Sequence, residues 1–406
     1  MSDVPRGPRR QRWLVAATEY AGLTSYTGGI GRHYAALLPA LVRSGVEIDL
    51  VVCSDDELPV GADIDGVRLI DAVRHGSRSP RVLRMLLGAR TVRRVFRRGS
   101  YDRIFLPEWS ALGSALPRSA PLVTNLATSI RLSNLVSGLR LSDMPVAGRI
   151  AVIVQDALET RQIRRSAALV AISTAMLART KDLLGALPPA AVVRNCIDVD
   201  AVRVAASTAG LPAQWPTGAE PVVLFLGRLE RRKGVVEAFQ AFALLVRQKP
   251  DARLVLAGSS GDRRFEPDLT ALLSILPESV RDRVVWLGHV AGAELYRAVG
   301  AATVVMCPSR WEGFGNVALE AKAIGTPLVV TTGSGYDDFC TDGVDCLMVP
   351  PGDHGALARA LRRVLDAPSD ALTRAATARA SVDRYAPEPV AAALVAAVDG
   401  LLGPVG

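Results

Sequence analysis

The chain has 406 residues, of which 49% are apolar and 22% are charged, and its formal net charge is +8. This length suggests two or three domains, each large enough to bury its own core. The composition excludes a disordered chain, which would carry fewer apolar residues and more net charge. The uncharged stretches fall short of the about 20 apolar residues that a membrane span needs. The apolar run Trp13 to Ala17 is too short for the core of a signal peptide, so we expect a globular cytoplasmic protein.

Five cysteines, at positions 53, 196, 307, 340 and 346, include no C-x-x-C pair, and only four histidines are present. The spacing of Cys340 and Cys346 matches no metal-binding motif. We therefore expect free thiols in a reducing compartment, and neither a metal nor another cofactor.

In the N-terminal half, short β-branched runs alternate with stretches of helical periodicity. We expect strands at 13–19, 46–53, 101–106, 121–126, 168–173 and 191–195. We expect helices at 31–45, at 78–98 and near 148–166. This alternation is typical of βαβ units, and it predicts a parallel sheet with helices on both faces.

The expected helix at 78–98 carries eight arginines with apolar residues between them. This pattern predicts a basic amphipathic helix, which is suited to peripheral contact with an anionic membrane. The alternative is a solvated helix whose apolar stripe packs on its own sheet. Charge alone is a weak sign of nucleic-acid binding, so we expect no nucleic acid as a partner.

Residues 205–220 are rich in Gly, Pro, Ser and Thr, and they form the best linker in the sequence. A second series of strands follows at 221–227, 252–258, 284–289, 303–308, 327–332 and 346–350, and helices are expected at 355–366, 369–384 and 387–402. These strands are almost continuously apolar, which indicates a parallel sheet buried on both faces.

The fold class is therefore α/β, with two doubly wound parallel-sheet domains. We expect an N-terminal domain at 1–200, on which the C-terminal helix of 387–406 packs back, and a C-terminal domain at 201–386. Ligands of such sheets bind at the carboxyl ends of the strands, and two facing domains predict a ligand cleft between them.

Gly28, Gly29 and Gly31 open a helix directly after the first strand. A turn of this kind presents backbone N–H groups at a helix N-terminus and suits a phosphate. It is neither G-x-G-x-x-G nor a Walker motif, so a plain strand-to-helix turn is the alternative.

Two cations flank the start of the C-terminal domain. Arg228 follows the first strand of this domain, and Lys233 precedes a helix. At the carboxyl edge of a sheet they can stabilise the charge on a departing phosphate. Lys233 is one of only four lysines in the chain, which argues against a merely solvated position.

The segment 309–327 holds Glu312 on a glycine-containing loop and Glu320 on a helix that begins near Asn316. At ~100° per residue, Glu320 and Lys322 lie about 200° apart and cannot share a narrow solvent face. If Lys322 takes the solvent side, Glu320 points inward or into a cleft, where it needs hydrogen-bond donors. Glu320 does not stand at the position that a capping box requires in a helix that begins near Asn316. The alternative is a buried ion pair between Glu320 and an arginine.

Taken together, these motifs resemble the family 4 glycosyltransferases. The resemblance extends roughly from residue 12 to residue 365, and its segments are 28–52, 192–200, 225–234, 284–290, 308–331 and 342–353. It implies the GT-B architecture, in which two facing Rossmann-like domains hold a nucleotide-sugar donor between them. It also implies a retaining, metal-independent hexosyltransferase, with front-face attack by a hydroxyl acceptor.

The resemblance also implies roles for particular residues. Glu312 would contact hydroxyls of the donor sugar, and Glu320 would contact the ribose. Arg228 and Lys233 would bind the diphosphate. The amides that complete the phosphate cradle would be those of Gly28, Gly29, Ile30, Gly313, Phe314, Gly315, Asn316 and Val317. The candidates for sugar or acceptor contacts are His33, Glu108 and Asn125, and Asn125 stands where the family often has a histidine.

The sequence departs from the family pattern at two further places. Cys196 replaces a glycine in the hinge, and the loop near 335 offers Asp337 or Asp338 in place of a glutamate. Neither the nucleotide nor the sugar is predicted. The acceptor is either a glycolipid or polysaccharide precursor or a small metabolite. The alternative functions are a phosphorylase or nucleotide-sugar hydrolase on the same fold, and a non-enzymatic basic protein that binds membranes or nucleic acid.

Overall fold

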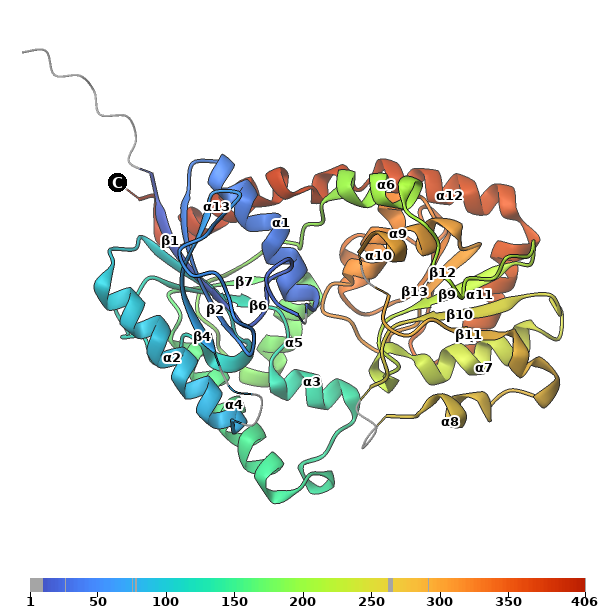
Figure 1. The fold of residues 1–406 in the computed structure, drawn as a ribbon, viewed down its shortest axis with the longest axis horizontal. Coiled ribbons are helices and arrows are strands. Elements are labelled where there is room, and N and C mark those ends of the chain that lie inside the picture. Colours follow the sequence, from blue (N-terminus) through green and yellow to red (C-terminus); the bar gives the residue numbers. More distant parts are fainter. Residues whose placement is uncertain are drawn as a thin grey trace, which may run out of the picture. The chain divides into compact units, whose positions relative to one another are not determined.

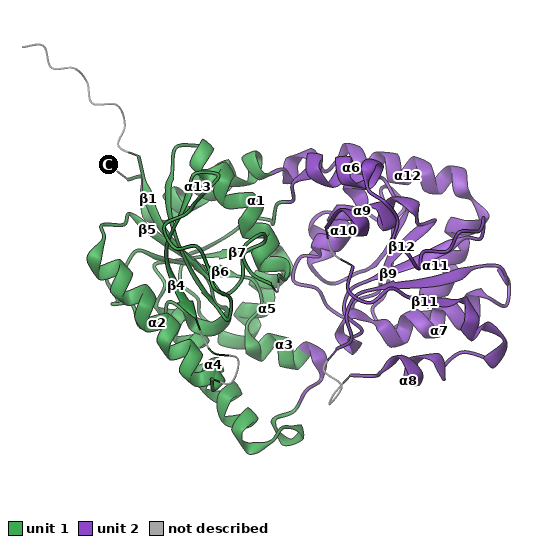
Figure 2. Ribbon diagram, viewed as in Figure 1, with its two compact units in different colours: residues 1–135, 140–196, 387–406 green, residues 136–139, 197–386 purple. Residues whose placement is uncertain are grey.

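A computed structural model of the chain describes residues 10–25, 27–74, 76, 79–261, 266–290 and 292–405 (Figure 1). The chain divides into two compact units (Figure 2). Unit 1 comprises residues 1–135, 140–196 and 387–406, and unit 2 comprises residues 136–139 and 197–386. The predicted linker at 205–220 is wrong in part. The chain passes from unit 1 to unit 2 between Cys196 and Ile197, and residues 199–208 form a helix.

Unit 1 contains an eight-stranded sheet in the order β3-β4-β2-β1-β5-β6-β7-β8. Its strands are β1 (Arg12–Ala17), β2 (Glu47–Ser54), β3 (Asp63–Ile64), β4 (Val67–Arg74), β5 (Arg103–Pro107), β6 (Leu122–Leu126), β7 (Ala168–Ala171) and β8 (Ala190–Val192). All neighbours are parallel except β3 and β4. The six predicted strands are confirmed. The β3–β4 hairpin was missed because β4 is half exposed and carries charges at Arg68, Asp71 and Arg74.

The helices of unit 1 cover both faces of this sheet. They are α1 (Gly29–Arg43), α2 (Arg81–Arg98), α3 (Ile130–Ser137), α4 (Val146–Arg165), α5 (Thr174–Leu184) and α13 (Pro387–Leu402), with 3-10 turns η1 (Trp109–Ala111) and η2 (Leu141–Asp143). Along β1, Trp13 and Val15 face a core shared with α1 and α13. Leu14 faces the opposite core, which α2 closes. This period of two is what a strand buried on both faces requires.

Unit 2 contains a six-stranded, fully parallel sheet in the order β11-β10-β9-β12-β13-β14. Its strands are β9 (Val222–Leu226), β10 (Arg253–Ala257), β11 (Val284–Trp286), β12 (Val304–Cys307), β13 (Leu328–Thr331) and β14 (Leu347–Val349). The helices are α6 (Val199–Thr208), α7 (Val235–Leu245), α8 (Leu269–Leu273), α9 (Gly292–Ala301), α10 (Asn316–Ile324), α11 (His354–Asp366) and α12 (Pro368–Ala380), with η3 (Arg231–Lys233), η4 (Glu278–Arg283), η5 (Gly335–Asp338) and η6 (Asp383–Tyr385). All six predicted strands are confirmed.

The arginine-rich helix α2 begins at Arg81, and Arg78 lies outside the described residues. Its apolar stripe, which includes Val92 and Val95, packs on the sheet, as the alternative interpretation predicted. Within the described part of the chain, we find no helix with the length and apolar character needed to cross a membrane.

Candidate functional site

The candidate site of unit 2 lies at the carboxyl ends of β9 and β12. These strands are parallel neighbours, so the loops that follow them meet at one edge of the sheet. Lys233 ends η3 in the first loop, and Glu312 lies in the second. Their side chains form an ion pair between Nζ and Oε2, and both remain partly exposed. The structure therefore brings together a cation and a carboxylate that are far apart in the sequence.

Gly234 permits the close approach of the two loops. Its φ is +73°, and a Cβ at this position would lie only 1.9 Å from the carbonyl oxygen of Pro308. Any side chain would therefore be strained and would also push the loops apart. A backbone hydrogen bond from Arg310 to the carbonyl of Arg232 (2.9 Å) ties the same loops together.

Glu312 stays ionised because of its surroundings. Burial by itself would raise the pKa of this carboxyl group, but the charges of Lys233 and Arg232 hold it below its usual value. Burial lowers the pKa of Lys233, and the Glu312 carboxylate offsets this in part. Ser309 Oγ donates to Glu312 Oε2 at 3.4 Å and so helps to orient the carboxylate.

Glu230, which the sequence did not single out, lies between two arginines. Its carboxylate accepts Arg228 at 3.0 Å and Arg232 at 2.9 Å. The Arg228 side chain is still 47% exposed, so its guanidinium can reach a ligand. Among these neighbouring groups, three cations face the carboxylates of Glu230 and Glu312.

Helix α10 begins beside Glu312. Its N-cap is Gly315, with φ +104°, and a Cβ there would lie 2.2 Å from the ring of Tyr336. The first-turn amides of a helix have no intrahelical acceptor and favour an anion. The predicted cradle residues Gly313, Asn316 and Val317 lie at this helix start. The side chain of Phe314 is buried and packs on Phe339, with ring centroids 4.9 Å apart.

Lys322 does not take a solvent side of α10. Residues 318–323 are all buried, and the Lys322 side chain is 0% exposed. Its Nζ donates to Asp345 Oδ2 at 2.8 Å and to the carbonyl of Phe339. Glu320 is also buried, on another side of the same helix. Helical periodicity separates the two residues correctly, but α10 has no solvent face to give to either.

Glu312 and Glu320 both affect the pKa of Cys307, the last residue of β12. Burial raises the pKa of this thiol to about 12; Lys233 lowers it, and both carboxylates raise it. The electrostatic effect of both carboxylates therefore reaches Cys307 at the edge of the sheet.

In unit 1, the glycine turn binds a carboxylate of the same chain, that of Glu19. The N–H groups of Gly28 and Gly31 donate to the two oxygens of Glu19, at 2.9 and 2.8 Å. Gly28, Gly29 and Ile30 thus lie at the start of α1, as predicted, but the amide of Gly28 is already bonded. Glu19 was missed, although an acid at the end of the first strand was the available signal.

His33 is buried in unit 1 and contacts the backbone of Cys196. Its Nδ1 accepts the backbone N–H of Cys196 at 3.1 Å. Burial lowers the pKa of His33 to about 4, so the imidazole is neutral. Cys196, which replaces the hinge glycine of the family, is not among the residues with positive φ. A side chain is therefore accommodated there without backbone strain.

Asn125 and Glu108 are also buried. The Asn125 amide donates to the carbonyl of Val170 at 3.1 Å. Both oxygens of Glu108 accept the N–H of Ala127, and burial raises the pKa of Glu108 to about 8. In this structure these side chains hold backbone segments of unit 1, and their contact with an acceptor stays a prediction.

Comparison with known proteins agrees with the fold. The model of the family "Glycosyl transferases group 1" matches residues 212–381, and the model of "Glycosyltransferase Family 4" matches residues 27–201. A D-inositol 3-phosphate glycosyltransferase of Kineococcus radiotolerans is 30% identical over 85% of this chain and 84% of its own. A glycogen synthase of Mycobacterium tuberculosis (strain H37Rv) is 29% identical over 91% of this chain and 89% of its own.

The solved structure of HepE from Anabaena in complex with UDP-glucose shares the fold, with a TM-score of 0.68 and 18% identity over 95% of this chain and 100% of that one. The two parallel-sheet units, with cations and carboxylates at a carboxyl sheet edge, define a glycosyltransferase of the GT-B fold that uses nucleotide sugars. The chain belongs to the family 4 glycosyltransferases.

Proposed function

We propose that the chain is a retaining hexosyltransferase that moves a sugar from a nucleoside-diphosphate sugar to a hydroxyl acceptor without a metal ion. The observation that carries this proposal is the Lys233–Glu312 ion pair beside the N-terminus of α10. In this proposal Lys233 and Arg228 bind the diphosphate, Glu312 binds hydroxyls of the sugar, and Glu320 binds the ribose.

The chemistry of the transfer suits this group of charges. Cleavage of the sugar–phosphate bond leaves negative charge on the diphosphate and positive charge on the sugar ring. Fixed cations and a helix N-terminus stabilise the first charge, which is why we propose that no metal takes part. In the absence of a donor, Glu312 is the partner of Lys233. A diphosphate competes for Lys233 and thereby frees the Glu312 carboxylate for the sugar.

The donor is tested by the thermal stability of the full chain with UDP, GDP, ADP and their sugars. UDP-glucose is the first to try, because the HepE structure contains it. Specific binding raises the melting temperature by mass action. The rise should largely vanish in Lys233→Ala and persist in Lys249→Ala, whose lysine pairs with Asp366. No shift with any member of the panel would contradict the donor assignment.

The phosphorylase and hydrolase alternatives are separated by products. A hydrolase releases nucleoside diphosphate from the donor at the same rate with and without an acceptor, and a phosphorylase transfers the sugar to inorganic phosphate. We expect nucleotide release to depend on a hydroxyl acceptor. The anomeric configuration of the product, read by NMR, tests retention.

An exposed apolar surface on unit 1 supports peripheral membrane contact and thus a lipid-linked acceptor. Val146, Ile150 and Ile153 are 68%, 54% and 54% exposed, and their spacing places them on one side of α4. Leu83, Leu86 and Leu87 of α2 are exposed as well. Ion pairs with Asp55 and Asp71 engage Arg84 and Arg94.

Sedimentation with vesicles tests the membrane proposal. The full chain should bind vesicles that contain anionic phospholipid, and Ile150→Asp should reduce this binding. The control is Leu372→Asp on α12, whose leucine is exposed but lies in unit 2. Equal binding of all three proteins, or no binding by any, would contradict the proposal and favour a small acceptor such as an inositol phosphate, the substrate named for the Kineococcus relative.

A further inference from the structure

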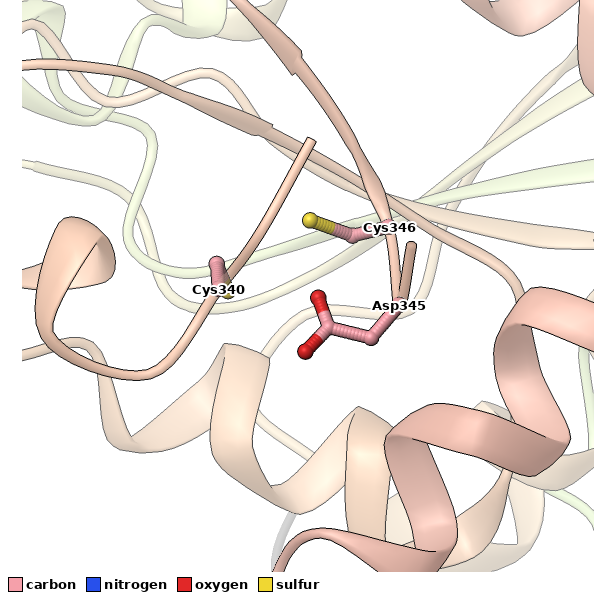
Figure 3. A group of neighbouring side chains, drawn as sticks. All are labelled: Cys340, Asp345 and Cys346. Carbon is pink, nitrogen blue, oxygen red and sulfur yellow. The ribbon is translucent and has the colours of Figure 1, made fainter. Parts of the chain in front are cut away.

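Two cysteines of unit 2 lie side by side in the loop between η5 and β14. Figure 3 shows Cys340, Asp345 and Cys346, whose Sγ and carboxylate oxygen atoms all lie within 4.8 Å of one another. The two cysteines are 6% and 1% exposed, and both are free thiols. They meet because the loop turns back on itself, with a hydrogen bond from Gly343 N to the carbonyl of Cys346 at 2.9 Å.

The surroundings of this group fit neutral thiols better than a metal ion. The two oxygens of Asp345 already accept Lys322 Nζ and the N–H of Thr341, each at 2.8 Å. The ammonium group of Lys322 also repels a cation at this position. A hydrogen bond with Cys340, together with burial, raises the pKa of Cys346 above the usual thiol range.

We propose that Cys340 and Cys346 are a reversible modification site, at which a peroxide converts the dithiol to an intramolecular disulfide. Cys340, the more exposed of the two, loses its proton, and its thiolate attacks the peroxide. The O–O bond breaks to give a sulfenic acid and hydroxide, and the hydroxide takes up the released proton as water. The thiol of Cys346 then attacks the sulfenic sulfur, the S–S bond forms, the S–O bond breaks and a second water leaves. Two thiols and one hydrogen peroxide thus give one disulfide and two waters. A dithiol reductant reverses the reaction by exchange.

The loop offers a route for the oxidant. Residues 341–344, between the two cysteines, are all exposed, so a local opening of this short loop is enough to reach the thiols. The disulfide would restrict the conformational freedom of the unfolded chain, and it should therefore raise the melting temperature. Cys340 directly follows Phe339, which packs on Phe314, so the bond would also stiffen the support of α10. The inference does not depend on the proposed transferase reaction.

The experiment uses the full chain, reduced and then treated with hydrogen peroxide. We expect the intact mass to fall by two hydrogen atoms. A protease that cleaves before aspartate cuts at Asp342 and Asp345, and without reduction it should release a peptide pair joined through Cys340 and Cys346. The product should vanish in Cys340→Ser and in Cys346→Ser and persist in Cys53→Ser. The melting temperature should rise on oxidation only in proteins that form the link.

Three results would overturn the proposal. One is a peroxide-treated protein in which all five thiols still react with an alkylating agent. Another is addition of oxygen atoms to Cys340 or Cys346 without a link between them. The third is binding of one Zn²⁺ per chain, lost in Asp345→Asn, in a protein that peroxide does not cross-link, because this would make the group a metal centre.

Discussion

Lys322 and Asp345 form an ion pair inside unit 2, with Nζ 2.8 Å from Oδ2 and the lysine side chain fully enclosed. Removal of one partner from such a pair leaves an uncompensated buried charge, which typically costs about 3–5 kcal/mol. We predict that Asp345→Asn lowers the free energy of unfolding by this order, as measured by denaturant titration. The matched control is Asp366→Asn, because Asp366 pairs with Lys249 at the same distance but at the surface, where loss typically costs at most about 1 kcal/mol.

Glu312→Gln separates sugar binding from nucleotide binding. Loss of one group that stabilises the transition state typically lowers kcat by about 10²–10³-fold, and we expect a fall of this size in kcat for transfer. Binding of the free nucleoside diphosphate should remain or tighten, because Lys233 loses the carboxylate that competes for it. Isothermal titration with the nucleotide measures its affinity, and a transfer assay with the donor measures kcat. Glu278→Gln, at an exposed position of η4, is the control. Weaker nucleotide binding in Glu312→Gln would contradict the assignment of this residue to the sugar.

Gly234→Ala should weaken the site without a change of charge. The alanine Cβ would meet the carbonyl oxygen of Pro308, and the backbone has positive φ, so the β9 and β12 loops must separate. We expect lower thermal stability and a smaller donor-induced shift in melting temperature. Gly343→Ala is the control: its φ is +71°, but nothing lies within 4 Å of the added Cβ. It should therefore lose some stability and keep the donor-induced shift. Equal donor-induced shifts in both variants would show that the approach of the two loops is unimportant for binding.

His33 gives unit 1 a pH dependence with a definite sign. Its pKa falls to about 4 in the folded protein from an ordinary value of 6.5, so the folded state favours the neutral imidazole. The stability that this contributes is present above pH 6.5 and is lost as the pH falls toward 4. Over this range the loss approaches about 3 kcal/mol.

Denaturant titrations at several pH values between 4 and 7 test the role of His33. In His33→Gln the fall in stability with acid should be smaller than in the wild type. It should be unchanged in His289→Gln, because that histidine is exposed. Identical pH profiles in all three proteins would show that His33 is not the titrating group.

Metal independence has a direct test. If Arg228, Lys233 and the start of α10 supply the positive charge for the diphosphate, then transfer should be unaffected by EDTA. Addition of Mg²⁺ or Mn²⁺ after EDTA should not raise the rate. Abolition of transfer by EDTA, with recovery on addition of Mg²⁺, would mean that a metal ion supplies part of the positive charge that stabilises the diphosphate.

Much of the sheet architecture and part of the site were readable from the sequence. Strands buried on both faces show as apolar runs, so all the strands of unit 2 were predicted, whereas the half-exposed β4 was not. Arg228, Lys233 and Glu312 were predicted together because each follows a parallel strand, and the carboxyl ends of such strands meet at one edge. Glu19 was missed because its partners are backbone amides that the folded turn brings to it. Glu230 was missed although its two arginine partners are close to it in the sequence.

The sequence by itself determined the alternation of strands and helices, the edge of the sheet at which the charges gather, and the angle between Glu320 and Lys322 on their helix. Only the tertiary structure decided what surrounds that helix. Periodicity relates two residues of one element to each other, but it carries no information about a remote segment. Helices α6, α9 and α12 pack against α10 and leave it without a solvent face. The loop that ends in Asp345 supplies the acceptor that allows Lys322 to be buried. The same loop brings Cys340 and Cys346 together, which their spacing did not predict.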